Sequence, residues 1–157
     1  MASFSARDLL IAQLVKRHPA RTEADIQADI YGLLTVGELN IGTDQAHMES
    51  PSADGTRRRI DVEVGQLAIE VKKDLRNQTV RADGESQLEG YIATRTEQSG
   101  AHYSGVLTDG VLWLLFNVGA EGRRLVADLD MTGKEPAVLV GWLEAVLSTQ
   151  TQVKPTP

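Results

Sequence analysis

The chain of 157 residues is 41% hydrophobic and 24% charged, proportions typical of a globular domain that buries its own core. Its formal net charge of −6 argues against a surface covered in basic side chains for nucleic acid, which leaves local basic patches or an acidic site neutralised by metal cations. The absence of cysteine excludes disulfides, thiolate catalysis and thiolate metal sites.

Two helices are predicted in the first part of the chain. Residues 5–18 carry an apolar stripe that ends before Pro19. A second helix begins at Thr22, because Thr22 and Asp25 have the spacing of a capping box and apolar residues then recur every 3.6 residues. The segment 37–58 is rich in Gly, Ser, Asp and Pro, which predicts a loop or a loop that holds a short strand.

Alternating apolar and polar residues predict two strands, 60–64 and 67–72, joined by a turn at Gly65-Gln66. The later elements are a polar connector (74–84), a helix (84–98), two strands within 101–119 around Thr108-Asp109-Gly110, a strand (122–131) and a helix (135–148). The order α-α-β-β-α-β-β-β-α predicts an α/β fold, a mixed β-sheet flanked by helices.

A single domain is expected over residues 1–148, with a flexible tail or linker at 149–157. The apolar runs are too short or too interrupted to span a membrane, and the N-terminus lacks the pattern of a secretory signal. We therefore expect no membrane partner and a cytoplasmic location.

The two central strands carry an unusual group of charged side chains. Glu70 and Lys72 are two residues apart and leave the same face of a strand. A tight turn at 65–66 pairs residues whose numbers sum to about 131, which places Asp61 opposite Glu70. Two carboxylates this close repel unless a cation lies between them, and oxygen ligands suit Mg²⁺, with Mn²⁺ as a substitute. Lys72 would orient an attacking water or neutralise charge on a phosphate.

Asp61 followed by Glu70-Val71-Lys72 across a hairpin resembles the signature of the PD-(D/E)XK nucleases, with Ile60 where the family name has proline. The resemblance covers about residues 20–120 and implies the restriction-endonuclease-like fold. It also implies Mg²⁺-dependent hydrolysis of DNA, by an endonuclease rather than an exonuclease, in a restriction, defence or repair system.

Three neighbouring features strengthen the resemblance. In this superfamily an acidic residue on the preceding helix often completes the metal site, and the helical angles favour Glu23, with Asp29 in reserve. Gln87 and Tyr91 share a helix face and match the Gln-x-x-x-Tyr motif of one nuclease subclass, where the pair lies beside the catalytic lysine and helps to bind DNA. The stretch 105–116, with its Leu-Thr-Asp-Gly and tryptophan, looks like a hairpin of restriction-enzyme nuclease domains and is expected to be structural.

Candidate contacts to the nucleic-acid backbone are Arg57, Arg58 and Arg59, which precede the first of the two strands. Because the chain is acidic, a homodimer or a partner specificity, motor or methyltransferase subunit or domain is expected to contribute DNA affinity. Two alternatives remain open: a nuclease-like module without turnover that serves binding or assembly, and a structural ion-pair cluster in an unrelated α/β protein.

Overall fold

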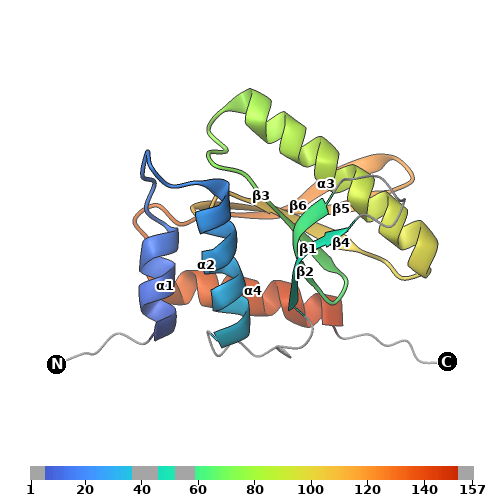
Figure 1. The fold of residues 1–157 in the computed structure, drawn as a ribbon. Coiled ribbons are helices and arrows are strands. Elements are labelled where there is room, and N and C mark those ends of the chain that lie inside the picture. Colours follow the sequence, from blue (N-terminus) through green and yellow to red (C-terminus); the bar gives the residue numbers. More distant parts are fainter. Residues whose placement is uncertain (1–5, 37–45, 52–58, 152–157) are drawn as a thin grey trace.

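The computed structural model describes residues 6–36, 46–51 and 59–151, with side chains described for 6–35 and 61–148. Within these ranges the chain forms a mixed β-sheet with helices on both faces (Figure 1). The elements are α1 (Ala6–Leu14), α2 (Glu23–Val36), β1 (Ala46–Pro51), β2 (Arg59–Val64), β3 (Leu67–Val71), α3 (Gln78–Ser99), β4 (Ser104–Thr108), β5 (Leu112–Gly119), β6 (Gly122–Asp130) and α4 (Pro136–Thr151).

The described strands form one six-stranded sheet in the order β1-β2-β3-β4-β5-β6. Neighbouring strands are antiparallel except for β3 and β4, which are parallel. Parallel neighbours cannot be joined by a tight turn, so the chain crosses between them through α3. This crossover places α3 against β3 and β4 on one face of the sheet.

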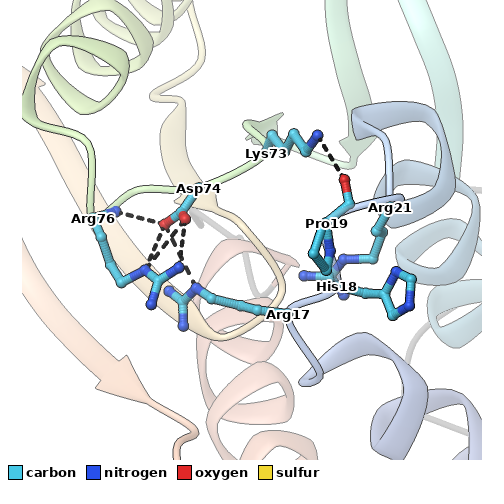
Figure 2. Close-up of a pocket in the computed structure, with 7 residues that line it drawn as sticks. All are labelled: Arg17, His18, Pro19, Arg21, Lys73, Asp74 and Arg76. Carbon is cyan, nitrogen blue, oxygen red and sulfur yellow. Dashed lines mark hydrogen bonds and ion pairs between the residues drawn. The ribbon is translucent and has the colours of Figure 1, made fainter.

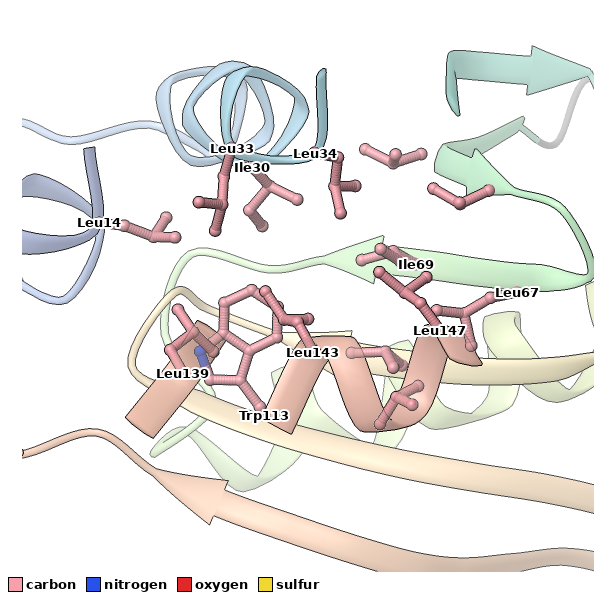
Figure 3. Packing of buried hydrophobic residues seen from close by; sticks show 14 of the residues in the cluster. Leu14, Ile30, Leu33, Leu34, Leu67, Ile69, Trp113, Leu139, Leu143 and Leu147 are labelled. Atoms are coloured by element: carbon pink, nitrogen blue, oxygen red, sulfur yellow. The ribbon is translucent and has the colours of Figure 1, made fainter. Parts of the chain in front are cut away.

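The opposite face of the sheet packs against α1, α2 and α4 (Figure 3). Its core comprises side chains from all three helices and from alternate positions of the strands: Leu14, Ile30, Leu33, Leu34, Leu67, Ile69, Trp113, Leu139, Leu143 and Leu147. Trp113 is fully buried, as expected for a structural residue of the 105–116 hairpin. The alternation is the two-residue period of a strand, which sends adjacent side chains to opposite faces.

Glycines line the contact between helix α3 and its face of the sheet, at positions where a larger side chain would clash. A methyl group on Gly84 would come within 2.8 Å of the Leu107 side chain and 3.3 Å of Lys72 Cγ. A methyl group on Gly105 would come within 2.5 Å of Ile92. These two glycines therefore set the distance between α3 and the strands that carry the charged group.

Several predicted features are confirmed. Thr22 and Asp25 form the reciprocal capping box of α2: the Asp25 N–H donates to Thr22 Oγ1 at 3.1 Å and the Thr22 N–H donates to Asp25 Oδ2 at 2.9 Å. The strands β4 and β5 form the hairpin predicted around Asp109-Gly110, with Gly110 in the left-handed region at φ 92°. In the described part of the chain, no helix is long and apolar enough to cross a membrane.

The segment 37–58 holds a short strand, β1, which was one of its two predicted alternatives; it pairs with β2, and the order of elements is therefore α-α-β-β-β-α-β-β-β-α. Three predicted boundaries were wrong. Helix α1 ends at Leu14 rather than at 18, where the Leu14 carbonyl accepts a hydrogen bond from Arg21. Helix α3 begins at Gln78 rather than 84, because Asn77 Oδ1 accepts hydrogen bonds from the first backbone amides and caps the helix. Helix α4 continues to Thr151, beyond the predicted end at 148.

Candidate functional site

The register predicted for the β2–β3 hairpin is confirmed, with Glu63 paired to Ala68 and Val64 to Leu67. Asp61 lies just beyond the paired residues, and its Oδ2 accepts a hydrogen bond from the Val71 N–H at 2.7 Å. The backbone carbonyl of Asp61 accepts a hydrogen bond at 3.1 Å from the buried side chain of Gln27 on α2. Asp61 is therefore held between β3 and α2, one strand away from Glu70.

Glu70 and Lys72 lie together on the α3 side of β3. Lys72 Nζ is 3.4 Å from Glu70 Oε2, and the two side chains are only 13% and 7% exposed. Burial, reinforced by repulsion from Asp61 and opposed by Lys72, raises the pKa of Glu70 to about 8. The fold thus holds a carboxyl group where its negative charge is strongly disfavoured, and a bound cation would reverse that preference.

Helix α3 supplies a further carboxylate to this group. Asp83 Oδ2 lies 3.7 Å from Lys72 Nζ and accepts a hydrogen bond from Gln87 Nε2 at 3.3 Å. Gln87 therefore reaches Lys72 through Asp83. Asp83 was not among the predicted site residues, because 74–84 was predicted to be a connector. The four-residue spacing of Asp83 and Gln87, on a helix that Asn77 caps, was the available signal.

The two acidic candidates on α2 lie in different surroundings. Glu23 is exposed, yet it is near enough to Glu70 to raise the pKa of that carboxyl, as the smallest of the contributing effects. Asp29 lines a pocket with Arg21 and Asp25, between α1 and α2, and burial raises its own pKa. The surroundings favour Glu23 over Asp29 as the acidic residue of α2 that faces the site.

Tyr91 has a different environment from Gln87. Its side chain is only 5% exposed, and its hydroxyl donates to Glu63 Oε2 at 3.3 Å. Arg95 also contacts Glu63 Oε2 at 3.2 Å and lies over the ring of Tyr103, with its central carbon 5.3 Å from the ring centroid. Glu63 is thus buried as part of a paired network. A direct contact of Tyr91 with nucleic acid stays a prediction.

The Leu-Thr-Asp-Gly hairpin binds the backbone of the candidate lysine and of the segment that follows it. The Lys72 N–H donates to the Thr108 carbonyl at 3.0 Å. The fully buried Asp109 accepts the Leu75 N–H at 2.8 Å and the Arg17 guanidinium at 2.8 Å. Its other oxygen accepts the backbone amides that follow it in the turn. A buried carboxylate satisfied in this way fixes the β3–α3 connection from which Lys72 projects.

The remaining candidates are only partly described. Arg57 and Arg58 lie outside the described residues, and Arg59 is described for its backbone alone, as the first residue of β2. Among the residues that the structure describes, no three His, Asp or Glu side chains lie close enough together to hold a metal ion. The described site is therefore a pair, Asp61 and Glu70, with Lys72 beside it.

No family model matches the chain, and neither a curated protein nor a solved structure is significantly similar to it.

Proposed function

We propose that the protein is a metal-dependent nuclease of the PD-(D/E)XK type, with a restriction-endonuclease-like fold, that hydrolyses phosphodiesters in DNA. The observation that carries the proposal is the convergence of Asp61, Glu70 and Lys72 on one side of the β2–β3 hairpin, with Lys72 Nζ 3.4 Å from Glu70. Three such charges in a mostly buried position are costly for stability, which favours a role in chemistry over one in folding.

The donor set fits Mg²⁺. Asp61 and Glu70 supply carboxylate oxygens, and Mg²⁺ characteristically binds through one or two carboxylates while keeping waters and substrate phosphate as its other ligands. Glu23 is the expected third acidic residue, within electrostatic range of Glu70. The bound metal would polarise the phosphodiester and lower the pKa of a water molecule.

The chain's own residues would position and stabilise the reacting groups. Lys72 would orient the attacking water or neutralise charge that develops on the phosphate. Asp83 and Gln87 would hold the Lys72 ammonium in place, since Asp83 lies 3.7 Å from Lys72 and accepts from Gln87. The hydrogen bond from the Val71 N–H to Asp61 Oδ2 would hold the Asp61 carboxylate in its orientation.

The setting we propose is cytoplasmic, in a restriction, defence or repair system, with endonucleolytic rather than exonucleolytic action. With a net charge of −6, the domain needs help to bind DNA. We propose that a homodimer, or a partner specificity, motor or methyltransferase subunit or domain, supplies that help.

The test is cleavage of supercoiled and linear DNA in Mg²⁺, Mn²⁺ or EDTA. The wild-type protein should cleave DNA in Mg²⁺ or Mn²⁺. The substitutions Asp61→Ala and Lys72→Ala should each abolish that cleavage. Asp128→Ala and Lys134→Ala, which remove exposed charges of the same kinds far along the chain, should leave it unchanged. Cleavage that continues in EDTA, or in both site variants, would refute the proposal. Metal binding without cleavage, in the wild type and with a DNA-binding partner present, would identify a module without turnover instead.

A further inference from the structure

A basic pocket of about 360 Å³ opens at the end of β3, between the β3–α3 connection and the α1–α2 connection (Figure 2). Its lining includes four cations, Arg17, Arg21, Lys73 and Arg76, and one carboxylate, Asp74. For a chain with a net charge of −6, this is a marked local concentration of positive charge.

Two of the four cations have carboxylate partners. Arg76 forms a forked pair with Asp74, with Nη2 2.7 Å from Oδ2, and this pairing lowers the pKa of Asp74. Arg17 is paired at 2.8 Å with Asp109, which is buried beneath the pocket. Arg17 Nε also lies 3.5 Å from Asp74 Oδ1, and Arg21 is near Asp25 and Asp29, which line a neighbouring pocket with it.

The other two cations are held by backbone carbonyls. Arg21 donates to the carbonyls of Leu14 and of Asp109, the latter at 2.9 Å, and Lys73 Nζ donates to the Pro19 carbonyl at 3.1 Å. A carbonyl satisfies the donor but does not neutralise its charge. The residues that line the pocket are thus four cations and one carboxylate, an excess of positive charge that suits a phosphate group.

The pocket adjoins the candidate nuclease site along two chain segments. Lys73 follows Lys72 directly after the end of β3; Lys72 contacts Glu70, and Lys73 Nζ donates to the Pro19 carbonyl. Arg21 precedes Glu23 by two residues, just before α2. The two sites are therefore one residue apart along the β3–α3 connection and two residues apart at the start of α2.

We propose that this pocket binds a phosphate group of the nucleic-acid strand beside the phosphodiester that is cleaved. This inference rests on the proposed nuclease function and adds a second phosphate site to it. The Arg21 side chain is already held in place by its hydrogen bonds to backbone carbonyls, so it would lose little conformational entropy when a phosphate binds. Lys73 and Arg76 are exposed and can turn toward the phosphate, with the guanidinium suited to binding two of its oxygens.

The experiment measures binding in EDTA, so it does not depend on cleavage. Fluorescent 12-nucleotide DNA strands, one with a 5′-phosphate and one with a 5′-hydroxyl, are titrated with wild-type protein, Lys73→Gln and Arg76→Gln. The matched control is Lys134→Gln, because Lys134 is also exposed and its Nζ also donates to a backbone carbonyl, that of Asp130 at 2.8 Å. Inorganic phosphate serves as the competitor.

Each pocket variant should weaken binding about tenfold and reduce the salt dependence by about one phosphate contact, whereas the control should stay within about twofold of wild type. Preference for the 5′-phosphorylated strand would assign the pocket to a terminal phosphate, and equal affinity would assign it to a backbone phosphate. Equal loss in Lys134→Gln, unchanged binding in both pocket variants, or no competition by phosphate would overturn the inference. Asp61→Ala should still bind, so failure of the pocket and failure of the catalytic proposal are distinguishable.

Discussion

Glutamine in place of Glu70 should make the protein more stable at alkaline pH. Glu70 is buried, and the pKa of its carboxyl group is raised from an ordinary value of 4.5 to about 8 by burial and by Asp61. Between these two values the unfolded chain has released the proton while the folded chain retains it. The folded state therefore binds more protons, and the free energy of unfolding must fall as pH rises through this window.

The size of the effect follows from the two pKa values. The raised pKa costs the wild type about 1 kcal/mol of stability at pH 5 and about 5 kcal/mol at pH 9. The wild type should therefore lose about 4 kcal/mol over this range relative to Glu70→Gln, whose side chain has a similar shape and does not titrate. For a chain of this length, such a difference is a large fraction of the total stability.

Urea unfolding in EDTA at pH 5, 7 and 9 measures this difference directly. Adding Mg²⁺ at pH 9 should then stabilise the wild type, because the cation favours ionised Glu70, and should have little effect on Glu70→Gln. The variant should also be inactive in cleavage. If the free energy of unfolding of the two proteins changed equally between pH 5 and pH 9, Glu70 would not have the raised pKa on which this prediction depends.

Five further substitutions test the residues that support the site and the packing around it. Asp109→Ala should cost about 3–5 kcal/mol in urea unfolding, because it removes the buried carboxylate that pairs with Arg17 and leaves backbone amides of Leu75 and the hairpin turn without an acceptor. Tyr91→Phe should cost about 1 kcal/mol in urea unfolding and leave cleavage close to wild type, whereas Gln87→Ala should slow cleavage about tenfold at little cost in stability. Gly84→Ala should slow cleavage by displacing the neighbouring lysine, while Gly141→Ala, in a helix with open space around it, should stabilise the fold by up to about 1 kcal/mol.

The controls for these substitutions are simple. Asp128→Ala removes an exposed carboxylate and should change the free energy of unfolding by less than about 0.5 kcal/mol. Loss of cleavage in Tyr91→Phe would instead indicate that its hydroxyl acts on nucleic acid. A Gly84→Ala protein with normal cleavage would show that the close approach of α3 does not govern the position of Lys72.

Local features of this chain were predictable from sequence. The capping box at Thr22 and the register around Gly65-Gln66 follow from short-range spacing, which depends on the backbone geometry of helices and strands. Strand β1 was left open by the sequence, because it exists through its pairing with β2. The errors were at helix boundaries: α3, for example, begins early because the side chain of Asn77 satisfies its first amides.

The sequence by itself determined that Asp61, Glu70 and Lys72 lie on one side of a hairpin, because a strand alternates its side chains whatever surrounds it. Only the tertiary structure decided that Glu70 is desolvated, that Asp83 reaches Lys72, and that the Tyr91 hydroxyl donates to Glu63. The basic pocket likewise arises where segments more than 50 residues apart meet, as in the contact of Lys73 with Pro19 (54 residues). Burial and the pairing of distant charges are properties of packed elements, and no local spacing encodes them.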